Sequence, residues 1–237
     1  MTKYYQYREN KLFISQKKIV DRVDIKKPLI FDVGANTGQS IAKYRSLFPK
    51  CTIHAFEPNP RSFRKLHEKY KNNCDIKLNC VGLSNYSGKF IFYDTKVSKA
   101  ASLLKPTKRL MNLSKKHKYD YKKIEIECDT LDSYSKISKI KHIDILKIDV
   151  QGAEALILRG ANELLSKHMI AIIYIEITNA ETYEKQSNLI DILSPLEKNG
   201  YKLWDFSPFL YTTPGRLWAA NAIFLSPDII LRLENII

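Results

Sequence analysis

The sequence predicts an α/β fold in which a mainly parallel sheet is covered by helices on both faces. Short apolar runs that fit buried strands alternate along the chain with stretches of helical spacing, and this order typically produces a parallel sheet. Two of the runs, near 29–38 and 143–154, end in an acidic residue followed by a glycine-bearing turn. The 237 residues suit one domain with a modest extension, and no repeat or linker divides them.

Residues 1–27 form a polar and basic segment before the first strand. Its apolar residues recur at helical spacing, at Leu12, Phe13, Ile19 and Val23. We therefore expect 1–27 to be an N-terminal helical extension that packs one face on the core, and a candidate lid over a ligand site. Residues 28–237 would form the main domain, because Pro28 closes the helix and starts the first strand.

The first strand ends in a turn with the pattern D-x-G-x-x-x-G. Its glycines let the backbone bend and approach a ligand, and the following helix points free N–H groups at that ligand. The dinucleotide turn needs glycine where Asn36 stands, and the P-loop needs a Gly-Lys-Ser/Thr ending, so both are excluded. We predict a nucleotide-like ligand here, with a purely structural turn as the alternative. The predicted binding residues are Asp32, Gly34, Ala35, Asn36, Thr37, Gly38 and Gln39.

The second strand, 51–56, ends at Glu57, 23 positions after Gly34. In doubly wound folds an acidic residue about 20 positions after the glycine turn reaches the ribose hydroxyls. We predict that Glu57 binds ribose beside Pro58; the alternative is a charge at the start of the next helix. A third strand, 76–81, leads to the place where adenine would lie, which adds Asn79 and Gly82 to the predicted ligand contacts.

An insertion-like region follows. Residues 89–94 and 123–128 alternate in polarity and predict strands. Between them, residues 95–121 form a basic stretch that we interpret as a lid or substrate loop, with Ser102 as a candidate substrate contact; a merely solvated loop is the alternative. Its positive charges include Lys105, Lys108, Arg109, Lys115, Lys116 and Lys118.

The second acidic element is the strand of 143–149, which ends at Asp149. Because the carboxyl ends of parallel strands meet at one crevice, we expect Asp149 to lie near Asp32 and Glu57. Lys147 is two positions away on the same strand face and could keep that carboxylate ionised.

The last third of the chain completes the alternation. A buried strand at 169–177 carries Glu176 near its end, and a helix at 189–198 follows. Strands at 201–206 and 218–225, the latter carrying Trp218, flank an aromatic loop, and a short helix follows Ser226-Pro227.

Composition restricts the function classes. The net charge of +14 fits an acidic partner such as a nucleic acid, but no RNA-binding module signature accompanies it. No apolar run approaches the roughly 18 residues needed to span a bilayer, and no apolar signal core is present, so we expect a cytoplasmic protein. The four cysteines form no C-x-x-C pair and are interpreted as buried free thiols, and no metal is expected.

The chain resembles the FkbM family of S-adenosylmethionine-dependent methyltransferases. The matching stretches are FDVGANTG (31–38), AFEPNP (55–60), GLS (82–84), TLD (130–132), LKIDVQGAE (146–154) and LRGA (158–161). The resemblance implies a Rossmann-like class I methyltransferase domain, with a seven-stranded sheet that has one antiparallel edge strand. It also implies S-adenosyl-L-methionine as cofactor and O-methylation, commonly of sugar hydroxyls. Gln151 departs from the family, which usually has glutamate there.

Methyl transfer to a hydroxyl needs a positioned acceptor and a base for its proton. We expect Asp149 to be that base, with Glu154 and Glu176 as alternates or orienters and Lys147 as the partner cation. The alternative role for Asp149 is to cap the next helix or to bind the cofactor amino group. A metal on the three carboxylates stays an alternative. Ser102 and Trp218 are the substrate candidates. The acceptor is predicted to be a carbohydrate; an RNA methyltransferase using loop 95–121 and a non-catalytic binding module are the other hypotheses, and no oligomeric state is assigned.

Overall fold

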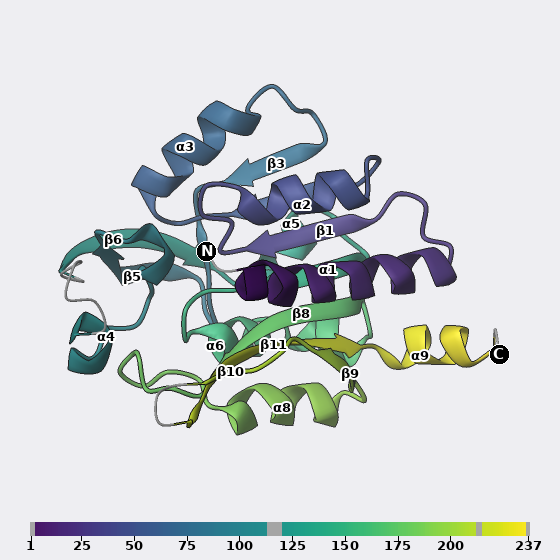
Figure 1. Cartoon of the computed structure of the whole chain (residues 1–237). Coiled ribbons are helices and arrows are strands. Elements are labelled where there is room, and N and C mark those ends of the chain that lie inside the picture. The colour runs from purple at the N-terminus through teal and green to yellow at the C-terminus, as the bar shows by residue number, and fades with distance from the viewer. Residues whose placement is uncertain (1–2, 113–119, 212–214, 236–237) are drawn as a thin grey trace.

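A twisted central sheet organises the protein (Figure 1). The computed structural model describes residues 3–112, 120–211 and 215–235. The strands follow the order β3-β2-β1-β7-β8-β11, and both β9 and β10 pair with the far edge of β11. The bounds are β1 Leu29–Val33, β2 Thr52–Phe56, β3 Ile76–Asn79, β7 Ile143–Ile148, β8 Ile170–Thr178, β9 Lys202–Phe206, β10 Leu210–Tyr211 and β11 Leu217–Leu225.

The sheet is parallel except around β11. This strand runs antiparallel to β8 and lies one position inside the edge, because β9 and β10 share the outermost position. The expected single antiparallel strand is therefore present, but its expected place at the edge is wrong. Within the described residues the sheet has seven positions and eight strands, since two short segments pair with successive parts of one long strand.

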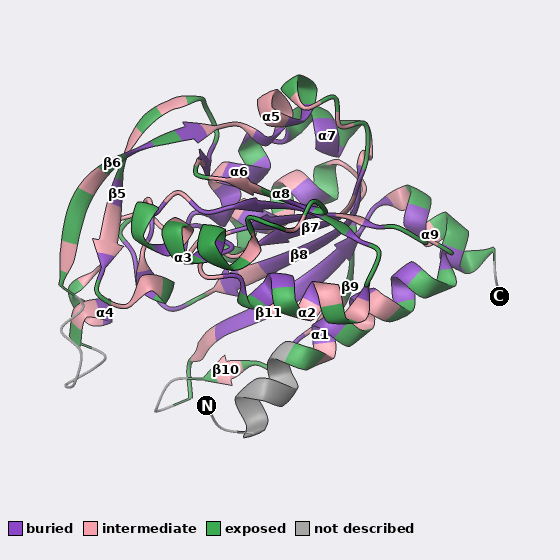
Figure 2. Ribbon diagram, turned by 90° about the horizontal axis from the view of Figure 1, so that it is seen from above, coloured by how far each residue is buried: buried purple, intermediate pink, exposed green. Residues whose placement is uncertain are grey.

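Helices cover both faces of the sheet, and the strands between them are buried (Figure 2). One apolar cluster joins one sheet face to α1 Lys3–Arg22, α2 Gln39–Leu47, α3 Pro60–Tyr70 and α9 Pro227–Glu234. The other joins the opposite face to α5 Leu131–Ile137, α6 Glu154–Arg159, α7 Asn162–Ser166 and α8 Leu189–Lys198. Side chains alternate along each strand, so Ile145 enters the first cluster and Leu146 the second.

Lys3–Arg22 of the N-terminal segment form the helix α1, which the spacing of the apolar residues predicts. Leu12, Ile19 and Val23 are buried in the first apolar cluster, so α1 packs directly on the sheet. No helix among the described residues is long and apolar enough to cross a membrane. The burial expected for all four cysteines is wrong for Cys74 and Cys80, which lie exposed in the segments around β3.

A second, three-stranded sheet lies at the end of the central one (Figure 1). Its strands are β4 Gly82–Leu83, β5 Gly88–Thr95 and β6 Tyr121–Asp129, in the order β4-β6-β5. The segment predicted as a loop contains the short helices η1 Ser98–Ala100 and α4 Lys108–Asn112. Lys115, Lys116 and Lys118 lie outside the described residues.

Candidate functional site

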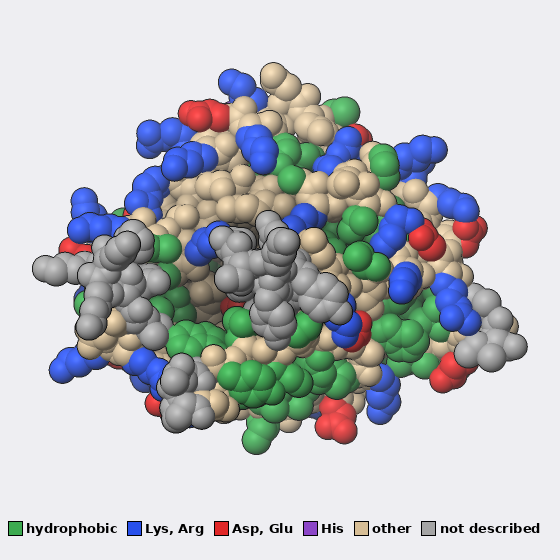
Figure 3. Space-filling model, viewed as in Figure 1, with side chains coloured by type: hydrophobic (Ala, Val, Ile, Leu, Met, Phe, Trp, Pro, Cys, Tyr) green, Lys and Arg blue, Asp and Glu red, His purple; other side chains and the backbone are tan. Residues whose placement is uncertain are grey.

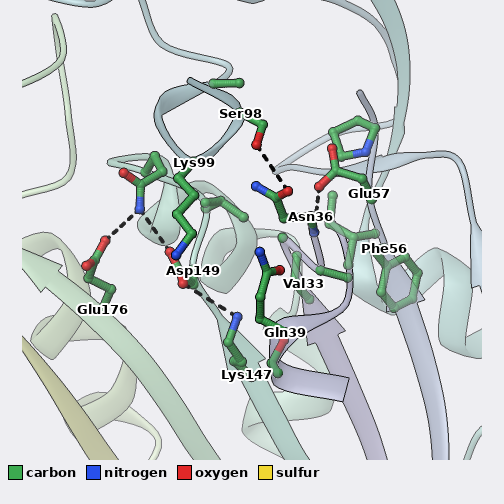
Figure 4. A pocket seen from close by; sticks show the side chains of 18 of the residues that line it. Val33, Asn36, Gln39, Phe56, Glu57, Ser98, Lys99, Lys147, Asp149 and Glu176 are labelled. Carbon is green, nitrogen blue, oxygen red and sulfur yellow. Dashed lines mark hydrogen bonds and ion pairs between the residues drawn. The ribbon is translucent and has the colours of Figure 1, made fainter. Parts of the chain in front are cut away.

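A cavity of about 350 Å³ opens where β1, β2, β7 and β8 end (Figure 4). The carboxyl ends of neighbouring parallel strands form such a crevice in open α/β sheets. Its described lining comes from the ends of these four strands, from the second sheet and η1, from α1 and α2, and from β10 and β11. Segments far apart in the sequence therefore share one site.

The glycine turn after β1 forms one wall of the cavity. Gly34 has φ +82, and a Cβ there would lie 2.0 Å from the backbone oxygen of Asp149, so the two strand ends approach as closely as they do only with glycine. Asn36 takes the left-handed conformation, φ +49, which asparagine tolerates. Ala35 and Gln39 also line the cavity, whereas Thr37 and Gly38 are outside its described lining.

Glu57, at the end of β2, faces the cavity from a buried position (Figure 4). Its carboxylate accepts the backbone N–H of Asn36 at 2.8 Å and that of Asn59 at 2.8 Å. Burial raises the pKa of Glu57 to about 7, and the two N–H donors oppose that rise. Each carboxylate oxygen has one further lone pair, so the fixed group can accept two hydrogen bonds from a vicinal diol.

The cavity is apolar next to Glu57. Pro58, Val81, Gly82, Leu83 and Phe92 line this end, the last three from the second sheet. Asn79 is placed differently from our expectation of an adenine contact. Its amide donates to the backbone oxygen of Ala55 at 3.1 Å and accepts from the hydroxyl of Tyr134 at 3.1 Å, so its polar groups hold β3 in place.

A buried lysine lies under the opposite end of the cavity. Lys147 Nζ is 3.1 Å from Asp32 Oδ1 and 3.6 Å from Asp149 Oδ2. Burial alone would lower the pKa of Lys147, but the charges of Asp32 and Asp149 outweigh it and raise the pKa. Asp32 is fully buried and also accepts from the hydroxyl of Ser40, so it anchors Lys147 beneath the cavity.

Gln151 connects two carboxylates at this end. Its Nε2 lies 2.9 Å from Asp149 Oδ1 and 3.0 Å from Glu176 Oε2 (Figure 4, dashed lines at Asp149 and Glu176). All three residues line the cavity, and the Asp149 side chain is 42% exposed. Asp149 thus has a lysine on one oxygen, an amide on the other, and access to the cavity.

Glu154 and Ser102 lie behind the cavity wall. Glu154 is buried, and its Oε1 accepts the backbone N–H of Val150 at 3.2 Å and of Gly152 at 3.1 Å. Burial raises the pKa of Glu154 to about 7. The Ser102 hydroxyl, also buried, donates to the backbone oxygen of Gln151 at 2.8 Å. Both side chains therefore fix the turn that carries Gln151. The described residues contain no group of three His, Cys, Asp or Glu side chains arranged to hold a metal.

The segment with η1 lies over the cavity mouth. Ser98 Oγ is 3.3 Å from Asn36 Oδ1, which ties η1 to the glycine turn, and the side chain of Lys99 reaches into the cavity toward Asp149 (Figure 4). Trp218 of β11 lines the far side, with the guanidinium of Arg109 5.7 Å from its ring centre. These residues enclose the space above Asp149 and Glu176.

The methyltransferase FkbM domain matches residues 32–203. This range covers most of the chain and includes the ends of β1, β2, β7 and β8. The chain belongs to the FkbM methyltransferase family. It is 28% identical over 186 residues to the 2-O-methyltransferase NoeI of Sinorhizobium fredii, covering 76% of this chain and 75% of that protein. It is 25% identical over 151 residues to methyltransferase 1 of Beauveria bassiana, covering 56% and 58% of the two chains. The structure of magnesium protoporphyrin IX methyltransferase from Synechocystis superposes with a TM-score of 0.49 at 11% identity, covering 94% of this chain and 82% of that one.

This FkbM protein is an S-adenosylmethionine-dependent methyltransferase, and its mainly parallel sheet has the predicted Rossmann-like class I fold. The cavity fits the cofactor: the carboxylate of Glu57 is fixed beside an apolar end, and the Gly34 turn has no room for a side chain. The lining residues that sequence reasoning missed include Phe92, Lys99 and the bridging amide of Gln151. Only Gln151 had a sequence signal, as a departure from the family pattern.

Proposed function

We propose that this methyltransferase transfers the methyl group of S-adenosylmethionine to a sugar hydroxyl, with Asp149 as the general base. The observation that carries the proposal is the continuity of the cavity. It runs from the ribose-type carboxylate of Glu57 to an end lined by Asp149, Glu176 and Trp218. The similarity to a protein named 2-O-methyltransferase supports an oxygen acceptor.

The cofactor end is assigned from its chemistry. Glu57 would accept hydrogen bonds from the ribose hydroxyls, and the apolar end with Leu83 and Phe92 would take the adenine ring. The turn at Gly34 would hold the amino-acid part, close to Asp149. When bound, the cofactor supplies an electrophilic methyl group on a positively charged sulfur.

Asp149 is suited to take the acceptor proton. Its exposed carboxylate faces the cavity, and the ammonium group of Lys147 lies 3.6 Å from its Oδ2. A hydroxyl held at near-attack distance gains about 7–11 kcal/mol from positioning. A positioned base adds typically about 10²–10⁴ in rate.

The acceptor end has the two kinds of group that a sugar needs. A sugar ring has an apolar C–H face and hydroxyls at its edge. Trp218 offers an aromatic surface, and Glu176 offers an acceptor for a neighbouring hydroxyl. Phe13 of α1 lines the same cavity, so we also propose that the 1–27 extension helps to close the acceptor side.

Glu57→Ala is expected to weaken S-adenosylmethionine binding about 10- to 100-fold, because hydrogen bonds to a charged group contribute about 1.5–3 kcal/mol. Isothermal titration calorimetry measures this affinity. The control is Glu197→Ala, which removes an exposed carboxylate of α8. Equal affinities of the two variants would contradict the ribose assignment.

Methyl-labelled cofactor tests the acceptor class directly. The protein is incubated with fractionated cell glycans, lipids and RNA, and we expect label in the glycan fraction. Label in RNA would instead support the nucleic-acid hypothesis. The structure gives that hypothesis little support: Lys105 pairs with Glu184 and Lys96 with Asp120, and the basic side chains are scattered over the visible face (Figure 3).

A further inference from the structure

We propose that Gln151 is a positioning residue that keeps the carboxylates of Asp149 and Glu176 ionised side by side. The inference rests on the proposed function only in naming Asp149 as the base. Its geometric basis is the single amide nitrogen within 2.9 Å of one carboxylate oxygen and 3.0 Å of the other. A side-chain amide nitrogen carries two N–H bonds, so it can donate one to each carboxylate.

The assignment of the nitrogen follows from its partners. An ionised carboxylate only accepts hydrogen bonds, so two ionised partners require the NH₂ group and exclude the amide oxygen. Without the bridge, two neighbouring carboxylates disfavour each other's charge, and one of them takes up a proton at higher pH. The amide opposes this without adding a charge of its own. The site therefore stays negative, which suits a cofactor whose sulfur is positive.

The backbone is shaped to present this side chain. Gln151 has φ +60, a left-handed conformation that costs a residue other than glycine free energy. Side-chain hydrogen bonds hold the turn: Ser102 Oγ donates to the backbone oxygens of Gln151 and Val150, and Glu154 accepts the N–H groups of Val150 and Gly152. The surrounding structure thus maintains an unfavourable conformation whose result is the amide bridge.

Other titratable groups surround the pair, and they come from several elements. These are Lys147 of β7, Asp32 of β1, Glu57 after β2, Glu154 of α6, Tyr174 of β8, Lys99 of η1, Lys43 of α2 and Tyr183 of the segment after β8. These groups are present both in the wild type and in the Gln151 variants. A difference between the pH profiles of the wild type and a variant therefore isolates the effect of the amide.

The test compares three substitutions. Gln151→Met keeps the length and removes the donors, Gln151→Glu adds a third carboxylate, and Gln151→Asn tolerates the left-handed backbone but is too short to span both partners. Infrared spectra of the cofactor-free proteins between pH 5 and 9 report the C=O band of protonated carboxyl groups. Calorimetry reports S-adenosylmethionine affinity over the same range.

We expect one additional carboxyl group to titrate in Gln151→Met and Gln151→Asn, with its midpoint raised by about one pH unit or more, as for two like charges that share one site. The midpoint in Gln151→Glu should be raised further. Cofactor affinity should fall on the acid side by about 10-fold relative to wild type, since a unit of pKa is a factor of ten. Toward pH 9 the cofactor affinity of the variants should approach that of the wild type.

Two results would overturn the proposal. One is an infrared titration identical to that of wild type, and the other is a loss of affinity that is the same at every pH, which a merely structural role would produce. Neither readout needs a methyl acceptor. If no acceptor fraction is labelled while the extra carboxyl titration appears, the proposed function fails and the role of Gln151 stands.

Discussion

Asp149→Asn is expected to lower kcat by about 10²–10⁴-fold, the usual contribution of a positioned general base. Asparagine keeps the shape of the side chain and an oxygen for the amide of Gln151, but it cannot take the acceptor proton. Affinity for S-adenosylmethionine should change only a few-fold. Single-turnover methyl transfer to the labelled glycan fraction, with calorimetry for cofactor binding, measures both quantities.

The matched control is Glu176→Gln, on the other partner of the same amide. A larger fall in kcat for Glu176→Gln than for Asp149→Asn would move the base to Glu176. If Asp149→Asn instead weakens cofactor binding and leaves the transfer rate intact, Asp149 binds the cofactor amino group and is not the base. The two variants thus separate the roles that the sequence left open.

Lys147→Met is expected to lower the free energy of unfolding by about 3–5 kcal/mol, because removing one partner of a buried ion pair leaves an uncompensated charge. Lys147 is 6% exposed and Asp32 0%, and they are 3.1 Å apart. The raised pKa of Lys147 keeps its stabilising charge fully present throughout the neutral range, to be lost only as pH rises through that pKa. Urea unfolding at pH 7 measures the loss.

Two further variants serve as a control and as a rescue for this prediction. Lys17→Met breaks the exposed Lys17–Asp21 pair and should leave the unfolding midpoint nearly unchanged. Combining Asp32→Asn with Lys147→Met removes the buried charge and should recover part of the loss. A loss below about 1 kcal/mol for Lys147→Met, the range of a surface pair, would contradict the importance of the buried pair.

The sequence determined the parts of this site that depend on chain-local patterns. Apolar runs that end in an acidic residue placed Asp32, Glu57 and Asp149 at strand ends, with a glycine turn after Asp32 and after Asp149. Parallel strands bring such ends together. Their register confirms the proximity, since Asp32 pairs with Lys147 across β1 and β7. The spacing of Lys147 and Asp149 likewise placed both on one strand face.

Only the tertiary structure decided how the remaining groups are used. Asn79, Ser102 and Glu154 look like site residues in sequence, yet their polar atoms bond to backbone or to a neighbouring side chain behind the cavity. The placement of η1 with Lys99, and the bridge of Gln151 between Asp149 and Glu176, depend on contacts between residues far apart in the chain. A local pattern can give a side chain its strand and its face. The hydrogen-bond partner is set by whichever group the folded chain brings within 3 Å or so, where a buried polar group must be satisfied.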